Sequence, residues 1–306
     1  MRHGSIRPSP CGIREQTAAA FTAIQPAVRS QPYSRVTNPD AAFGAEIPEI
    51  YQTCLVPLIF EPYAADLANR LMSRSPDRVL ELAAGTGVVT RKLASRLPEQ
   101  VTIVATDLNQ SMLDFARARG TARPVEWRQA DATELPFDDH AFDAVVCQFG
   151  AMFFPDRPKG FSEARRVLRP GGVFIFNVWD RIEHNGFADA VTTALQPLFA
   201  EDPPRFLART PHGYHDRSTI ARDLSKAGFK CSADIVTVAE CSRAESPRVP
   251  AVGFCQGTPL RNEIEARDPS SLGRATDAAT AAIAARFGSG AVEAPTQAHV
   301  ITVDAS

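Results

Sequence analysis

The sequence predicts a doubly wound α/β fold, in which a mostly parallel sheet carries helices on both faces. Between residues 78 and 178, short apolar runs rich in β-branched residues alternate with stretches of helical spacing, as expected for parallel strands joined by helices. The run Val79–Leu82 also leads through a small-residue loop, Ala83–Gly87, into a helical stretch. Such a glycine turn lets backbone approach a ligand closely, and the helix start offers free N–H groups.

The strands and helices of this alternation can be placed in order. Strands are expected at 78–82, 101–106, 125–128, 142–147 and 173–178, and helices at about 87–97, 111–119 and 158–168. Before the first strand, apolar spacing predicts helical segments at 47–51, 55–60 and 63–68, broken by Pro57 and Pro62. In the last third we expect helical stretches at 182–206, 218–227, 247–264 and 271–287, and strands at 234–238 and 299–303.

The domain limits follow from composition. Residues 1–40 carry scattered Pro, Ser and Arg without a sustained period, which indicates a disordered tail or an over-long start, with a short helix at 17–24. The arginines there also fit an organellar transit peptide. Residues 41–306 are expected to form one domain, in which segments 181–215 and 247–287 build a cap together with the N-terminal helices.

Composition and charge argue against several classes of protein. The formal net charge is −2, so no basic field favours DNA, RNA or an anionic membrane. The six cysteines include no C-x-x-C pair and indicate free thiols in a reducing compartment. No apolar run approaches the roughly 18 residues that span a bilayer, and no signal peptide is visible. We therefore expect a cytoplasmic protein with no nucleic-acid partner and no integral membrane segment.

An acidic residue after the second strand indicates the ligand. Asp107 ends the apolar run that follows the glycine loop, twenty residues after Gly87. A carboxylate at that place can accept both hydroxyls of a ribose, which predicts an adenosine-type cofactor. Alternatively, Asp107 only caps the next helix. A nicotinamide loop of the G-x-G-x-x-G type needs a third glycine where Thr90 stands, and it leaves Asp131 unexplained.

Four motifs occur in a characteristic order: Glu81-Leu-Ala-Ala-Gly-Thr-Gly, Asp107-Leu-Asn-Gln-Ser-Met-Leu, Gln129-Ala-Asp-Ala-Thr-Glu-Leu-Pro-Phe and Leu168-Arg-Pro-Gly-Gly. Together they resemble the class I S-adenosylmethionine-dependent methyltransferases, in particular the small-molecule branch that includes the ubiquinone/menaquinone-biosynthesis type. The resemblance covers about residues 43–303 and is strongest over 78–179. It implies a seven-stranded Rossmann-like sheet with a helical cap, and methyl transfer from S-adenosylmethionine to a small organic acceptor.

The resemblance also implies a role for each matched position. The amino-acid end of the cofactor is held by Glu81, Ala83, Gly85, Thr86 and Gly87; the ribose by Asp107; the adenine by Leu108, Met112, Asp131 and Ala132; and the methyl-transfer side is lined by Gln148 and Phe149. Turn capping by Asp131 and plain loop packing by Gln148 and Phe149 are the alternatives. Ala83 stands where many relatives carry glycine, and it permits close approach provided that its φ is negative.

No general base is evident in the sequence. Methyl transfer depends mainly on alignment and exclusion of water, and it needs a base only when the nucleophile carries a proton. His184 and His215 are weak candidates, together with His212, and the H-x-x-H spacing lacks further ligands, so no metal is expected. Two other functions remain: a non-catalytic cofactor-binding module and an NAD(P)-dependent oxidoreductase. A homodimer is an expected assembly.

Overall fold

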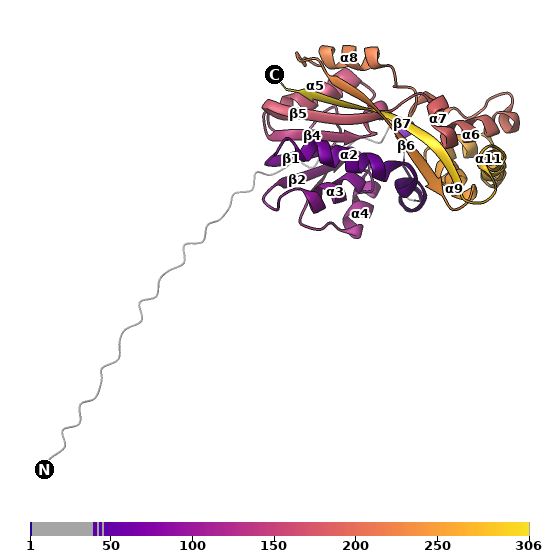
Figure 1. The fold of residues 1–306 in the computed structure, drawn as a ribbon, viewed down its shortest axis with the longest axis horizontal. Helices are drawn as coiled ribbons and strands as arrows, with labels where there is room; N and C mark the ends of the chain where they lie inside the picture. The colour runs from indigo at the N-terminus through magenta and orange to yellow at the C-terminus, as the bar shows by residue number, and fades with distance from the viewer. Residues whose placement is uncertain (2–38, 42, 45, 306) are drawn as a thin grey trace. The chain divides into compact units, whose positions relative to one another are not determined.

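The computed structural model describes Met1 and residues 39–41, 43–44 and 46–305. The expectations for the first 40 residues, including the helix at 17–24, therefore fall almost entirely outside the described part. Contacts separate residues 1–35 from a compact unit at 36–306, and everything below concerns that second unit (Figure 1).

Seven strands form one sheet in the order β3-β2-β1-β4-β5-β7-β6. The strands are β1 (Arg78–Leu82), β2 (Thr102–Asp107), β3 (Glu126–Gln129), β4 (Phe142–Gln148), β5 (Leu168–Trp179), β6 (Asp234–Ala244) and β7 (Val292–Asp304). The first five pair in parallel, and β7 runs antiparallel to both of its neighbours. This confirms the predicted α/β class and the mostly parallel seven-stranded sheet.

The helices pack in groups around this sheet. The regular helices are α1 (Ile47–Ile50), α2 (Glu61–Met72), α3 (Val88–Arg96), α4 (Gln110–Arg119), α5 (Arg157–Val167), α6 (Gly186–Leu195), α7 (Phe206–Arg209), α8 (Arg217–Lys226), α9 (Arg248–Gln256), α10 (Leu260–Arg267) and α11 (Leu272–Phe287). Helix α2 packs against α3, and α5 packs against α8. The central strand β4 is buried except at Asp143, as expected where helices cover both faces of a parallel sheet.

Sequence signals explain where several helices begin. At the start of α5, the carboxylate of Asp156 accepts a hydrogen bond from the Lys159 N–H at 3.0 Å, and Pro158 occupies the first turn. At the start of α8, Asp216 accepts one from the Thr219 N–H at 2.8 Å. Both are side-chain caps that satisfy a backbone N–H left free at a helix N-terminus.

The predicted break at Pro57 is wrong. Residues Tyr51–Phe60 form a π-helix, η2, which joins α1 to α2 without interruption. In this wider helix the Glu61 N–H bonds to the Val56 carbonyl. Pro57 has no N–H to donate, and the helix continues without that one hydrogen bond. The helix also continues through Pro62, in the first turn of α2, so the break predicted there is wrong as well. Residues of η2, among them Tyr51 and Phe60, line the cavity described below.

Other predicted boundaries are also wrong in part. The stretch 182–206 contains α6 and short 3-10 turns rather than one helix, and 247–264 divides into α9 and α10 at Gly257. The residue before Pro259 disfavours helical backbone, which explains that division. Strands β6 and β7 extend well beyond 234–238 and 299–303.

The extension of β6 and β7 positions the cap segments. Pairing of β5 with β7 ends at Trp179 and Ala298, whereas β6 and β7 stay paired as far as Ala244 and Val292. The antiparallel pair β6–β7 therefore projects past the carboxyl end of β5, where α6, α7, α9 and α11 gather (Figure 1). Helix α6 packs against α11 and β7, and α9 packs against η2.

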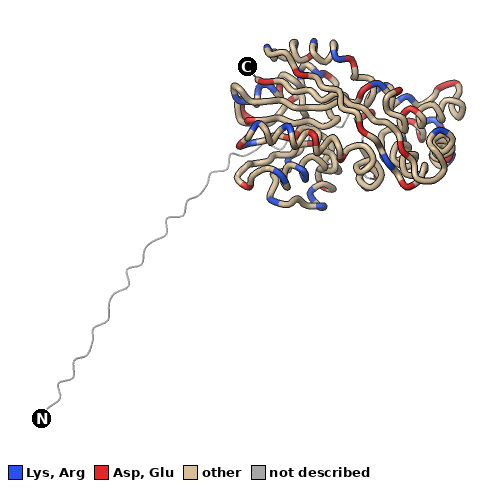
Figure 2. The backbone as a smooth tube through the Cα atoms, viewed as in Figure 1, with Lys and Arg blue, Asp and Glu red and all other residues tan. Residues whose placement is uncertain are grey.

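Helix length, charge distribution and cysteine and metal-ligand positions can be stated for the described residues. None of its described helices is long and apolar enough to cross a bilayer. Basic and acidic residues are interspersed over its elements rather than gathered on one basic face in this view (Figure 2). Its five described cysteines form no disulfide with one another, and no group of three or more His, Cys, Asp or Glu in this part is arranged to hold a metal ion.

Candidate functional site

Two carboxylates meet at the carboxyl edge of the sheet. Glu81 is the last residue but one of β1 and pairs with Ala105 of β2, and Asp107 is the last residue of β2. The strand order changes direction beside β1, which neighbours both β2 and β4. In open α/β sheets, ligands bind outside the carboxyl ends of strands at such a point. The two predicted acidic residues therefore lie where a ligand is expected.

Asp107 holds the glycine loop in place. One carboxylate oxygen accepts the Gly85 N–H at 2.8 Å, and the other accepts the Asn109 N–H at 2.8 Å. The loop is tied to β2 as well, since the Ala84 N–H donates to the Thr106 carbonyl at 2.9 Å. Helix α4 begins after Asn109, so Asp107 does not occupy the N-cap position. Each carboxylate oxygen can accept a further bond, which leaves capacity for a ribose.

Glu81 is almost entirely buried beneath the loop. It is 2% exposed, and the Thr90 hydroxyl donates to its Oε2 at 2.6 Å. Burial raises the pKa of Glu81 to about 8, against the lowering effect of the Thr90 hydrogen bond and the nearby Arg91 guanidinium. Without a cationic ligand, this side chain is therefore mostly protonated at neutral pH.

Ala83 does not meet the condition of a negative φ that was set for close approach. Its φ is +52°, in the left-handed region that favours glycine. A close neighbour, Gly150, explains how the loop is held: a Cβ added there would lie 2.4 Å from the Ala83 Cβ and 2.8 Å from the Cys147 sulfur. The absence of a side chain at Gly150 leaves room for the Ala83 side chain. The Ala83 backbone is strained, because alanine rarely adopts a positive φ.

The other predicted cofactor residues lie around the end of β2. Leu108 is half-buried and Met112 is buried on α4, and the Gln129 amide donates to the Leu108 carbonyl at 2.8 Å. Asp131 caps a turn, since its Oδ1 accepts both the N–H and the hydroxyl of Thr133 at 2.7 Å. Asp131 thus makes the turn-capping contact that was the alternative to adenine binding. The cap uses only Oδ1 and leaves Oδ2 of Asp131 available for a ligand. Ala132 follows directly and is half-buried.

Several groups around the loop are suited to an adenosine-type cofactor. A Cβ added at Gly85 would meet no atom within 4 Å, so the loop has open space above it. Two buried polar atoms, the Thr86 hydroxyl and the Gln148 Oε1, have no hydrogen-bond partner in the described part of the chain. Buried polar groups are normally paired, and a polar ligand would pair them. The residues present therefore fit the cofactor that the sequence motifs imply.

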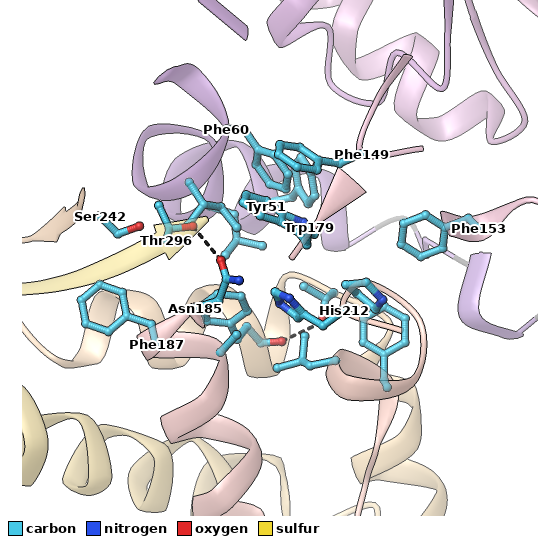
Figure 3. Close-up of a pocket in the computed structure, with 18 of the residues that line it drawn as sticks. Tyr51, Phe60, Phe149, Phe153, Trp179, Asn185, Phe187, His212, Ser242 and Thr296 are labelled. Atoms are coloured by element: carbon cyan, nitrogen blue, oxygen red, sulfur yellow. Dashed lines mark hydrogen bonds between the residues drawn. The ribbon is translucent and has the colours of Figure 1, made fainter. Parts of the chain in front are cut away.

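A cavity with an aromatic lining opens beyond Phe149, and we call it the aromatic cavity (Figure 3). Its rings come from η2, the loop after β4, the end of β5 and the cap segments. The ring-bearing residues that line it are Phe43, Tyr51, Phe60, Phe149, Phe153, Trp179, Phe187, Phe206, His212 and Phe254. Of the apolar residues that follow β4, Phe149 and Phe153 line the cavity, whereas Met152 and Phe154 are buried and do not.

Phe149 and Tyr51 connect the two halves of the site. The Phe149 ring stacks on Trp179 with centroids 3.6 Å apart and planes 5° apart, and its backbone is held at φ +49°. The Phe149 N–H donates to the Asn177 side-chain oxygen at 2.9 Å, which fixes this turn. Burial, helped by the nearby Asp107 carboxylate, raises the pKa of Tyr51. Tyr51 therefore stays neutral between the cofactor edge and the cavity.

Few polar groups line the aromatic cavity, and most of them already have partners. Asn185 accepts the Thr296 hydroxyl at 2.8 Å and donates to the Arg181 carbonyl at 3.2 Å, and Thr258 donates to the Phe254 carbonyl at 2.7 Å. The Ser242 hydroxyl is different: it is buried and has no partner in the described part of the chain.

Replacing Ser242 with alanine is expected to leave the free energy of unfolding unchanged or to raise it by up to about 1 kcal/mol. No hydrogen bond is lost, and an unpaired buried hydroxyl is removed. Ser271→Ala is the matched control, because the buried Ser271 hydroxyl donates to the Asp268 carbonyl at 2.7 Å and its loss should cost about 1 kcal/mol. Urea unfolding of both variants checks this, and equal destabilisation by the two substitutions would contradict it.

Of the three candidate histidines, only His212 lines the aromatic cavity. His184 lies half-exposed on a 3-10 turn, 3.0 Å from an Asp180 carboxylate oxygen, and His215 Nδ1 lies 2.8 Å from the His212 carbonyl. Neither lines the aromatic cavity, whereas His212 does. The signal that could have ranked His212 first is its place between Pro211 and Gly213 in an apolar stretch. Ser242 and Thr296 carried no such signal, because they lie in strand extensions that sequence spacing did not predict.

Comparison with known proteins gives a consistent result. The family described as "Methyltransferase domain" matches residues 80–176. The ubiquinone/menaquinone biosynthesis C-methyltransferase UbiE of Pseudomonas aeruginosa is 30% identical over 225 residues, covering 63% of this chain and 88% of that protein. A demethylmenaquinone methyltransferase of Deinococcus radiodurans is 43% identical over 107 residues, covering 34% of this chain and 44% of that protein.

Solved structures agree on the fold. The YcgJ protein of Bacillus subtilis has a TM-score of 0.51 at 18% identity and covers 79% of this chain and 98% of its own. Phosphoethanolamine N-methyltransferase 2 of Haemonchus contortus, solved with S-adenosylhomocysteine, has a TM-score of 0.50 at 19% identity and covers 88% of this chain and 59% of its own. None of these matches favours the nicotinamide alternative. The family match and the 30% identity to a relative of which the chain covers 88% show that the chain belongs to the S-adenosylmethionine-dependent methyltransferases, in the family that includes the ubiquinone/menaquinone C-methyltransferases.

Proposed function

We propose that this methyltransferase transfers the methyl group to a small, flat, largely apolar organic molecule that binds in the aromatic cavity. The single observation that carries the proposal is the Phe149–Trp179 stack, which forms one wall of that cavity directly after β4. The end of β4 adjoins the loop that holds the cofactor, because Gly150 packs on Ala83. A molecule in the cavity would then face the cofactor beside the Phe149 ring, between Phe149 and Tyr51.

The chemistry of the lining supports this class of acceptor. Small-molecule sites are mostly apolar, with a few placed polar groups, and aromatic walls favour a ring that can stack or meet them edge-on. Relatives named for ubiquinone and menaquinone biosynthesis agree with an acceptor that has an apolar body. Transfer from a sulfonium is an in-line displacement, so a closed cavity contributes by aligning the acceptor and excluding water, worth up to about 7–11 kcal/mol for well-oriented partners.

A labelled-transfer experiment tests the proposal. Protein loaded with S-[methyl-³H]adenosylmethionine is mixed with the small-molecule fraction of a cell extract, and the label is measured in organic solvent. We expect labelled product from the wild type and none from a variant that fills the cavity, Ala188→Trp, provided that this variant still binds S-adenosylhomocysteine. Label that stays in the aqueous phase for both proteins would favour the non-catalytic binding module instead.

Within this proposal, Glu81 pairs with the ammonium group at the amino-acid end of the cofactor. Because the pKa of Glu81 is raised to about 8 in the empty protein, cofactor binding below that pH should release a proton as the carboxylate forms. Calorimetric titration with S-adenosylhomocysteine at pH 7, in two buffers of different ionisation enthalpy, should therefore give different heats. Glu81→Gln, which cannot ionise, is the control and should give equal heats after correction. Proton uptake on binding would contradict this role.

The same shift predicts how stability depends on pH. The folded-state pKa of Glu81 lies above the ordinary value of 4.5, so the folded protein holds more protons than the unfolded chain between those values. The contribution of Glu81 is then fully present below about pH 4.5 and is lost as pH rises through 8. Urea unfolding measures the free energy of unfolding at pH 6 and at pH 8. From pH 6 to pH 8 this free energy should fall more for wild type than for Glu81→Gln, and an equal fall would contradict the raised pKa.

Three further expectations remain part of the proposal. The cytoplasmic location, the homodimer and the absence of a metal are predictions from the sequence alone. Cell fractionation, light scattering and activity after dialysis against a chelator would test them in turn. The roles of the individual cofactor residues, including Leu108, Met112 and Asp131, are proposals of the same kind.

A further inference from the structure

His212 presents one nitrogen to the aromatic cavity. Its Nδ1 lies 2.8 Å from the Asp180 carbonyl oxygen. A carbonyl oxygen only accepts, so Nδ1 carries the proton, and in the neutral ring Nε2 is then the atom with the free lone pair. No hydrogen bond to Nε2 occurs within the described part of the chain. The ring is 5% exposed and lines the cavity, where it points toward the same space as Asn185 (Figure 3).

The backbone holds this ring in a fixed orientation. Asp180 directly follows Trp179, and its own N–H donates to the Gln297 carbonyl at 3.0 Å. The Asp180 carboxylate accepts in turn the Arg181 N–H at 2.7 Å and the Gln297 side-chain amide at 2.5 Å, and neither bond involves His184. The acceptor of the His212 proton is therefore anchored to β7 and to the turn after β5. A ring tethered in this way offers Nε2 at a constant position, which is what selective recognition requires.

The imidazole is also uncharged. Burial lowers the pKa of His212 to about 4, against the raising effects of the Asp180 and Glu183 carboxylates, and with His215 lowering it further. A neutral ring can only accept at Nε2. Asn185 and Thr258 already have partners. His212 Nε2 is a buried acceptor on the cavity wall, which also carries the Tyr51 hydroxyl and the unpaired Ser242 hydroxyl.

We propose that His212 determines acceptor specificity, by taking a hydrogen bond at Nε2 from an O–H or N–H group of the molecule to be methylated. The inference rests on the proposed function and deepens it: a flat apolar body fills the cavity, and one proton-donating substituent faces His212. A buried acceptor left without a donor is costly, so molecules without such a group bind less well. A purely structural His212 would need only Nδ1, and it would not distinguish these two kinds of molecule.

Binding of paired probes tests the inference without knowledge of the natural acceptor. Equilibrium dialysis measures the affinity of 2-naphthol, naphthalene and 2-methoxynaphthalene for the full chain saturated with S-adenosylhomocysteine. We expect wild type to prefer 2-naphthol over the other two by about tenfold, the value of one net hydrogen bond. His212→Phe keeps a ring of similar size and should lose the preference. His184→Phe removes an imidazole from the same Asp180 but from outside the cavity, and it should keep the preference.

Each outcome has one meaning. A tenfold preference in wild type that disappears in His212→Phe supports the inference. Equal affinities for all three probes in wild type, or an unchanged preference in His212→Phe, overturn it and leave the aromatic cavity as the acceptor site. If none of the probes binds to wild type, the proposed function fails, and the inference fails with it. The wild-type comparison needs no variant, so the inference stays falsifiable if His212→Phe does not fold, as judged by loss of S-adenosylhomocysteine binding.

Discussion

Replacing Asp107 with alanine is expected to weaken the binding of S-adenosylhomocysteine at least 100-fold. The carboxylate has two functions in this site. It holds the glycine loop through the Gly85 N–H and the start of the next turn through the Asn109 N–H, and it is placed to accept the ribose hydroxyls. Each charge-assisted hydrogen bond contributes about 1.5–3 kcal/mol, so losing two to the ligand already gives this factor, before any displacement of the loop.

Isothermal calorimetry measures this effect, and α4 supplies a matched control. Asp114 is an exposed aspartate that accepts the Gln110 amide at 2.7 Å, and Asp114→Ala should leave the affinity unchanged. Asp131→Ala should weaken binding less than Asp107→Ala, because Asp131 holds only the Thr133 turn, whereas Asp107 also holds the Gly85 N–H of the glycine loop. An affinity within threefold of wild type for Asp107→Ala would contradict the assignment of the ribose site.

The second large effect is expected at Gly150, which carries no chemistry of its own. Gly150→Ala would place a Cβ 2.4 Å from the Ala83 Cβ, and neither atom lies at the end of a flexible side chain. Overpacking of this kind costs about 1–3 kcal/mol. Relief of the contact would displace the Ala83 backbone, so cofactor affinity should fall together with stability.

A double-mutant cycle isolates that contact. Ala83→Gly alone should stabilise the protein by about 1 kcal/mol, because alanine at φ +52° is strained and glycine is not. In Gly150→Ala/Ala83→Gly the close pair no longer exists, so stability and affinity should recover in large part, with only the Cys147 contact remaining. Ala84→Gly, one residue along at a position without positive φ, should destabilise instead. Additive effects of the two substitutions would show that the contact does not restrain the loop.

The parallel half of the fold could be predicted because its signals are local. The strand at Arg78–Leu82 was placed without error, since an apolar run followed by a glycine turn has few alternatives. The loop, Glu81 and Asp107 then lie together because parallel strands end at the same edge of a sheet. In physical terms, the cofactor half of the site follows from strand order and chain direction.

The cavity half could not be predicted in the same way. The antiparallel pair β6–β7, which extends beyond β5, and the helices that pack on it bring together Ser242, Thr296 and His212. Those contacts join residues far apart in the chain, and the polar residues among them interrupt the apolar pattern of a strand. The π-helix at Tyr51–Phe60 was missed for a related reason, since proline normally marks the end of a helix and only the tertiary structure shows that it does not here.

A crystal structure of the protein with S-adenosylhomocysteine bound tests the central claim most directly. The account predicts the ribose hydroxyls within hydrogen-bond distance of Asp107, the amino-acid end over the Ala83–Gly87 loop beside Glu81, and the sulfur facing the aromatic cavity between Tyr51 and Phe149. A ligand bound elsewhere, or a sulfur separated from the cavity by the Phe149–Trp179 stack, would contradict the assignment of that cavity as the acceptor site.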